Sequence, residues 1–169
     1  GKIYYLDASR PKLGFGKLGY DAFNGHARVI NEKATPLEFL SDSLVEGSLA
    51  SAFIANDEKG NLTGNIQKIL GYYESYDIRN RIKEKGKDQL FNEIKAAFGA
   101  EIEMSGQTID SLEKYDDPLG IRYAFSIKPG GEDIFYFNPM CSEGYRDNPF
   151  KSAGRSYPVE LPYTIDRNF

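Results

Sequence analysis

The chain has 169 residues, 40% of them hydrophobic and 14% aromatic, which is enough apolar material for a folded core of about one domain. Its formal net charge of −4 argues against the extended basic surface of a nucleic-acid-binding protein. The longest apolar runs, such as Ile134-Phe135-Tyr136-Phe137, are far shorter than the roughly 20 residues of a membrane-spanning helix.

The first 40 residues contain short strand signals separated by a long irregular segment. Aromatic and β-branched residues at 2–6 predict a strand rather than a signal peptide. Glycine, proline and Asn-Gly breakers make 8–25 an irregular connector, of a length that usually has a packing or functional reason. A second strand is expected at 27–31, ended by Pro36.

The middle of the chain changes from strand to helix periodicity. Residues 47–55 and 62–70 flank the polar turn 56–61 and predict a long β-hairpin. From about 75 to 98 the apolar residues recur at helical spacing, with one interruption at Gly86 and a second helix capped by Asp88. Gly99 occupies the position of a left-handed C-cap.

Strand periodicity returns after the helical segment. Alternation around Ile102 and Met104, and again over 122–127, predicts strands with one buried face. The turn 129–131 is expected to pair the latter strand with 133–137, followed by a loop-rich region with extended pieces at Val159 and 163–165. The predicted fold class is therefore α+β: a mainly antiparallel sheet of long hairpins, with the amphipathic segment at about 75–98 packed on it.

Cys141, His26 and Asp7 are the only residues that could imitate a thiol, a base and an orienting carboxylate. A nucleophilic cysteine needs an electropositive setting that lowers its pKa, whereas Cys141 lies in a proline-bounded loop with an acidic neighbour, Glu143. A loop cysteine is therefore favoured over a nucleophile. His26 follows the turn pair Asn24-Gly25, and a strand-edge or turn role is favoured for it over a base or a ligand.

Two further patterns imitate known binding motifs without their context. One pattern is a cluster of carboxylates that suggests a calcium site: Asp110, Glu113, Asp116 and Asp117. Lys114 and Pro118 stand where a calcium loop has ligand positions, so the pattern fails. The turn 57–61 fails the same test, because Lys59 occupies a ligand position. No metal or other cofactor is therefore expected. Gly14, Gly16 and Gly19 satisfy G-x-G-x-x-G, yet no amphipathic helix follows them, so a flexible connector is favoured over a nucleotide site. The frequent tyrosines suit half-buried strand positions as well as binding platforms.

Several short motifs in one order resemble a known family. Tyr4-Tyr5-Leu6-Asp7-Ala8-Ser9 is similar to the strand that carries the third triad residue in bacterial transglutaminase-like, papain-fold proteins. The downstream order resembles a subgroup of envelope-associated proteins of unknown function; the matching segments are Phe15-Gly16, Asn24-Gly25, 57–64, Gly71-Tyr72, 77–79, 137–139, 148–150 and 155–159.

The resemblance implies that Asp7 orients the histidine of a Cys-His-Asp triad whose cysteine and histidine precede this chain. It divides the chain into the end of a transglutaminase-like core with a connector (1–25), a β-rich accessory domain (26–162) and the start of a following β domain (163–169). The implied partners are the upstream core and neighbouring β domains, and the implied location is the periplasm or cell envelope.

The leading hypothesis is a non-catalytic accessory domain of a transglutaminase-like cell-envelope protein, with peptidase-like chemistry left open for the parent. The chain itself is not expected to be an enzyme, because two triad members are missing and loss of any one costs orders of magnitude in rate. A stand-alone module that binds glycan or peptide through tyrosines is the first alternative. A cysteine hydrolase that uses Cys141 is the second.

Overall fold

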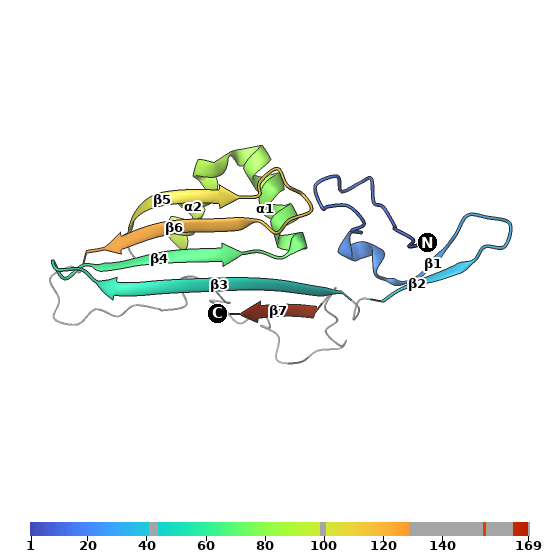
Figure 1. Cartoon of the computed structure of the whole chain (residues 1–169), viewed down its shortest axis with the longest axis horizontal. Helices are drawn as coiled ribbons and strands as arrows, with labels where there is room; N and C mark the ends of the chain where they lie inside the picture. Colours follow the sequence, from blue (N-terminus) through green and yellow to red (C-terminus); the bar gives the residue numbers. More distant parts are fainter. Residues whose placement is uncertain (41–43, 99–100, 129–153, 155–163, 169) are drawn as a thin grey trace.

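The structure is a computed structural model that describes residues 1–40, 44–98, 101–128, 154 and 164–168. Those residues form an α+β fold dominated by strands, with seven strands and two α-helices arranged in two mostly antiparallel sheets (Figure 1). The predicted fold class is thus confirmed.

The main sheet has five strands in the order β5-β6-β4-β3-β7. All neighbours are antiparallel except β3 and β7, which run parallel. The strands are β3 (Val45–Asn56), β4 (Leu62–Ile69), β5 (Glu103–Asp110), β6 (Gly120–Ile127) and β7 (Thr164–Asn168). The predicted hairpin of 47–55 and 62–70 is confirmed as β3 and β4.

The turn of this hairpin is stabilised by one carboxylate. Asp57 Oδ1 accepts hydrogen bonds from the backbone N–H groups of Lys59 and Asn61, both at 2.8 Å, and Oδ2 accepts one from Asn61 Nδ2 at 2.7 Å. Gly60 supplies the positive φ of 78° that the turn requires. The Asp57 carboxylate, which had been considered as a calcium ligand, therefore stabilises the turn through hydrogen bonds.

Two helices form the second layer. Helix α1 (Tyr72–Lys85) and helix α2 (Lys87–Ala97) are separated by Gly86, whose φ is 85°. The predicted helical segment with one interruption is confirmed, but Gly86 rather than Asp88 is the N-cap of α2. Because α2 begins directly after Gly86, Asp88 lies inside the first turn, where a negative charge still favours the helix N-terminus.

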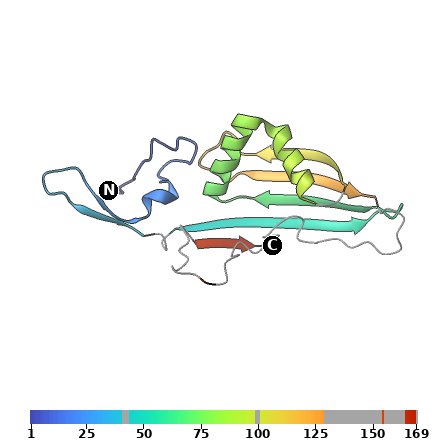
Figure 2. The same cartoon turned by 180° about the vertical axis from the view of Figure 1, so that it is seen from behind.

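The core lies between these helices and one face of the sheet. Along β6 the residues Ile121, Tyr123, Phe125 and Ile127 are all buried, which is the alternation that the sequence predicted. They pack in one cluster with residues of β4, the helices and the segments beside them: Ile66, Leu70, Ile82, Leu90, Phe91, Ile102 and Leu119. Figure 2 shows the helices on this face, and no helix covers the opposite face among the described residues.

The N-terminal segment differs from the prediction in its strands. Residues 1–7 have no regular structure, so the strand predicted at 2–6 is wrong for this chain. Tyr5 packs against Phe39 of the strand β2 (Pro36–Phe39), but no described strand pairs with this segment through backbone hydrogen bonds. The second strand is β1 (Gly25–Arg28), which pairs with β2 (Pro36–Phe39) in a separate two-stranded sheet. Pro36 therefore begins a strand instead of ending one, as proline can at a strand's first residue.

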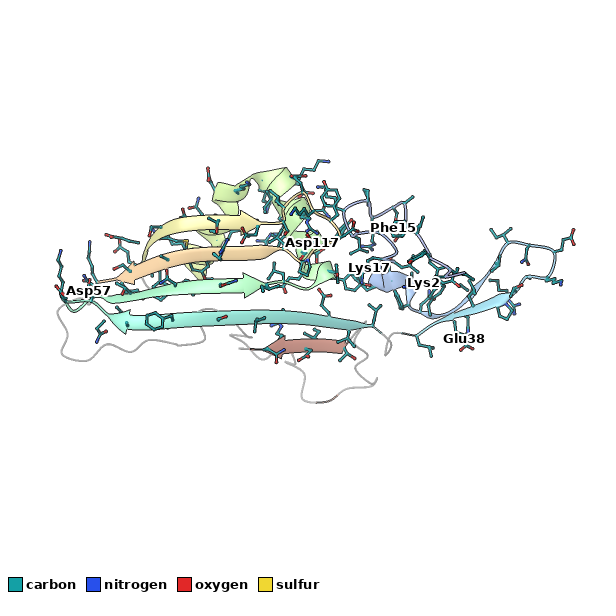
Figure 3. The ribbon with its side chains drawn as sticks, in the orientation of Figure 1. Lys2, Phe15, Lys17, Glu38, Asp57 and Asp117 are labelled. Carbon is teal, nitrogen blue, oxygen red and sulfur yellow. The ribbon has the colours of Figure 1, made fainter. Side chains whose placement is uncertain are left out.

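The irregular segment 8–24 is packed rather than a flexible connector. Leu13 is fully buried, the Phe15 N–H donates to Asp116 Oδ1 at 2.6 Å, and Tyr73 Oη donates to the Leu18 carbonyl at 2.9 Å. Figure 3 shows Phe15 and Lys17 on the side of this segment that faces the main sheet. Only a single 3-10 turn, Tyr20–Ala22, follows Gly19, so the helix that a dinucleotide fingerprint needs is absent from this described stretch.

The C-terminal strand joins the main sheet. The extended piece predicted at 163–165 overlaps β7 (Thr164–Asn168), which pairs in parallel with β3. Strand β6 pairs with β4 and β5. Three predictions lie outside the described residues: the hairpin of β6 with 133–137, the extended piece at Val159 and the C-cap at Gly99.

Candidate functional site

Asp7 lies in a network that fixes its carboxylate. Oδ1 accepts hydrogen bonds from the Ser9 N–H at 2.9 Å and from the Ser9 hydroxyl at 2.5 Å. Oδ2 accepts one from the Gly19 N–H at 3.2 Å. The tight turn at Asp7 and the return of the chain at Gly19 thus hold the carboxylate from two directions.

Arg10 supports the same network from the side. Its Nε lies 3.9 Å from Asp7 Oδ2, and its Nη2 pairs with Asp21 Oδ1 at 3.0 Å. The guanidinium also lies 5.4 Å and 5.7 Å from the ring centroids of Tyr20 and Tyr76, within cation–π range. Arg10 therefore ties Asp7 and Asp21 to an aromatic side chain of helix α1.

The hydrogen bonds from Ser9 lower the pKa of Asp7 below its ordinary value of 3.8, with smaller contributions from Gly19 and Arg10. The carboxylate is therefore ionised at neutral pH. Its side chain remains 20% exposed. A carboxylate has about four acceptor positions, so Oδ2 keeps capacity for one more donor, such as an imidazole N–H. Asp7 can therefore accept a hydrogen bond from a histidine and orient its ring, but a reaction would need a nucleophile and a base from other residues.

The structure does not bring the other triad-like residues to Asp7. His26, the single histidine of the chain, is exposed on β1, and no hydrogen bond or ion pair joins it to Asp7 in the described ranges. Cys141 lies outside the described residues. Asp7 therefore has neither base nor thiol within the part of the chain that the structure describes.

Three of the four carboxylates of the acidic stretch have separate partners. Asp110 pairs with Arg122 at 2.8 Å, Asp116 accepts the Phe15 N–H, and Glu113 accepts a hydrogen bond from the Tyr115 hydroxyl at 3.1 Å. Among the described residues, no group of three or more histidine, cysteine, aspartate or glutamate side chains could hold a metal ion.

A cavity of about 350 Å³ lies where the N-terminal segment meets the main sheet and the start of α1. We call it the junction cavity; most of its lining is aromatic or aliphatic, and it includes Tyr5, Lys17, Phe39, Glu46 and Tyr72. The Lys17 ammonium lies 4.0 Å from the centre of the Tyr72 ring. Apolar walls with a few polar groups are typical of small-molecule sites.

Glu46 is the polar residue of this cavity that sequence reasoning missed. It is 6% exposed and accepts hydrogen bonds from the backbone N–H groups of Tyr72 at 3.1 Å, Tyr73 at 2.9 Å and Glu74 at 3.1 Å. Burial raises the pKa of the Glu46 carboxyl, although these three donors and the Lys17 charge oppose the shift.

The sequence did hold one signal for such a residue. Helix α1 starts after Gly71, which has no side chain to cap the first turn. Its free N–H groups must then find an acceptor elsewhere in the chain. A glutamate on the buried face of a strand is a suitable acceptor, but only the tertiary structure identifies Glu46 as that residue.

No helix in the described ranges combines the length and the apolar character needed to cross a membrane. No protein-family model, curated protein or solved structure matches the chain.

Proposed function

We propose that this chain is a non-catalytic accessory domain that packs on a transglutaminase-like catalytic core supplied by residues outside it. The proposal depends most on Asp7, an ionised and oriented carboxylate with no described thiol or imidazole beside it. Such a carboxylate suits the third position of a Cys-His-Asp triad, where it holds the imidazole in the productive orientation.

The residues before Asp7 support a partner at this position. Ile3 is 75% exposed and Leu6 is 65% exposed, and Tyr4 is also exposed. Apolar side chains gathered on one short segment typically mark a surface that another polypeptide covers. In the proposed assembly, this segment adds a strand to the catalytic core and so places Asp7 against its histidine.

The open face of the main sheet supports contact with a neighbouring β domain. Val45, Leu49 and Phe53 alternate along β3 on the face away from the helices, and Ile69 lies opposite Leu49 on β4. Phe53 is 70% exposed. In the proposed assembly this open face packs against a neighbouring β domain of a cell-envelope protein. The location in the periplasm or envelope is proposed from the family resemblance alone.

The direct test measures binding of the catalytic-core polypeptide, the residues encoded before Gly1, by isothermal titration calorimetry. The double variant Ile3→Asp/Leu6→Asp should weaken binding at least tenfold, because it places charges in an apolar interface. Ile30→Asp is the matched control, since Ile30 is fully exposed in the loop between β1 and β2. No measurable binding of the unmodified chain would refute the accessory role.

A second candidate function is binding of a glycan or peptide in the junction cavity. Tyr5, Tyr72 and Tyr73 line it together with the buried Glu46, which provides stacking surfaces and a polar group in one place. The test is a glycan array and a peptide library probed with the unmodified chain and with Tyr72→Ala. Absence of any ligand that Tyr72→Ala weakens would remove this candidate.

The cysteine-hydrolase alternative gains no support from the described residues, since His26 is exposed on β1 and makes no described hydrogen bond or ion pair with Asp7. A thiol-reactive probe tests it directly. Labelling of Cys141 no faster than free cysteine would end that alternative.

A further inference from the structure

Arg79 is the most deeply buried cation that the structure describes. It lies on helix α1 with 2% of its surface exposed. Its Nε donates to the Leu112 carbonyl at 3.1 Å. Its Nη2 lies within hydrogen-bond distance of three more carbonyls, those of Ser111 at 2.9 Å, Lys114 at 2.9 Å and Asp117 at 2.8 Å. One edge of the guanidinium thus holds the loop 111–117.

The other nitrogen of this guanidinium is left without a partner. Arg79 Nη1 is buried and has no hydrogen-bond acceptor among the described residues. No described carboxylate lies within ion-pair distance of Arg79 either, although Glu113 and Asp117 are near enough to act on it through space. Backbone carbonyls carry only partial charge, and the Tyr115 ring, whose centroid lies 5.5 Å from the guanidinium carbon, carries no net charge. Within the described ranges the positive charge is therefore buried without a matching anion, which is unfavourable.

A cavity of about 300 Å³ lies beside Arg79, and we call it the arginine cavity. Lys12 and Lys83 line it with Arg79, and Ile82 and Leu112 provide apolar wall. Among the described residues, Glu113 contributes the only carboxylate of the lining, and it accepts the hydrogen bond of the Tyr115 hydroxyl. Three cationic side chains against one carboxylate make the cavity electropositive.

We propose that the arginine cavity binds an oxyanion, the carboxylate or phosphate group of a small molecule. Arg79 Nη1 donates to the anion from the buried side, and the ammonium groups of Lys12 and Lys83 approach it from the more exposed side. Charge-assisted hydrogen bonds of this kind are among the strongest that proteins make. Ile82 and Leu112 contact the short apolar part of the ligand. This site is separate from Asp7 and does not depend on the accessory role.

The competing explanation is that Arg79 only clamps the loop and that water fills the cavity. Replacing Arg79 would release the loop in either case, so the lysines provide the sharper test. The variant Lys12→Gln/Lys83→Gln keeps the guanidinium and its four carbonyl contacts. The matched control is Lys87→Gln/Lys95→Gln, which removes the same charge from exposed positions of α2 outside the cavity lining.

The experiment titrates inorganic phosphate and, separately, acetate at constant ionic strength set with chloride. Calorimetry gives the affinity, and the NMR signal of the Arg79 Nε–H reports whether the anion reaches the guanidinium. We expect saturable binding of at least one anion, a shift of that signal, and roughly tenfold weaker binding in Lys12→Gln/Lys83→Gln but not in the control.

Binding of phosphate alone or of acetate alone supports the proposal and identifies the preferred group. No saturable binding by the unmodified chain overturns it. Equal affinity of Lys12→Gln/Lys83→Gln, with both variants folded by their amide spectra, also overturns it, because the anion would then lie elsewhere on the surface.

Discussion

Replacement of Glu46 by alanine tests whether this side chain caps helix α1. In the structure its carboxylate is the shared acceptor for three backbone N–H groups at the start of that helix. Glu46→Ala removes all three acceptor contacts at once, together with the carboxylate that faces Lys17.

The expected loss follows from the burial of each donor. The Tyr73 N–H is buried, and a buried donor without a partner costs about 1–3 kcal/mol. The N–H groups of Tyr72 and Glu74 are only part-buried, so water can replace part of the contact, and losing a cap of this kind costs about 1 kcal/mol. We expect Glu46→Ala to lower the free energy of unfolding by about 3 kcal/mol in total.

The assay is urea unfolding at neutral pH, followed by far-ultraviolet circular dichroism. Glu84→Ala is the control, because Glu84 is exposed near the end of the same helix and its replacement should change stability by less than about 0.5 kcal/mol. A loss below about 1 kcal/mol for Glu46→Ala, or one equal to the control, would refute the capping role.

The pH dependence of Glu46→Gln provides an independent check. Burial raises the pKa of Glu46 above its ordinary value of 4.5, so the folded chain binds this proton more readily than the unfolded chain. The stabilisation that comes from this proton is fully present below pH 4.5, and it is lost as the pH rises through the raised pKa of Glu46 in the folded state. The unmodified chain should therefore gain stability relative to Glu46→Gln as the pH falls from neutral. A loss of stability relative to Glu46→Gln as the pH falls would contradict the raised pKa that burial gives Glu46.

Three further substitutions have defined outcomes in the same unfolding assay. Gly64→Ala should cost about 2–3 kcal/mol, because the new Cβ would lie 2.6 Å from the ring of Phe125; unchanged stability would show that the sheet yields there. Arg79→Met should cost about 2–4 kcal/mol and speed hydrogen exchange over 111–117, whose carbonyls lose their donor. Asp7→Asn should lower the free energy of unfolding by about 1 kcal/mol. In the unmodified chain, the stability that the ionised Asp7 contributes is lost as the pH falls below 3.8 through the lowered pKa, and the variant should lack this acid-dependent loss. An unaltered acid profile would count against the hydrogen bonds at Asp7.

The elements whose periodicity is local could be predicted from the amino-acid order alone. Alternation over β6 and the polar turn 56–61 predicted a half-buried strand and a hairpin, and both are present. Helical spacing with a break at Gly86 predicted α1 and α2. These features follow from the side-chain period of two in strands and 3.6 in helices, which needs no knowledge of the rest of the chain.

The way in which the elements pack together, and the roles of the buried polar residues, depend on contacts between distant parts of the chain. The apolar run 2–6 has a strand-like composition, but a strand also needs a neighbour that accepts and donates its backbone hydrogen bonds, and no described strand pairs with this run. The parallel pairing of β7 with β3, the packing of Leu13 and the capping of α1 by Glu46 all join residues far apart in sequence. Such contacts depend on which surfaces are buried together, and neither periodicity nor local propensity encodes that choice.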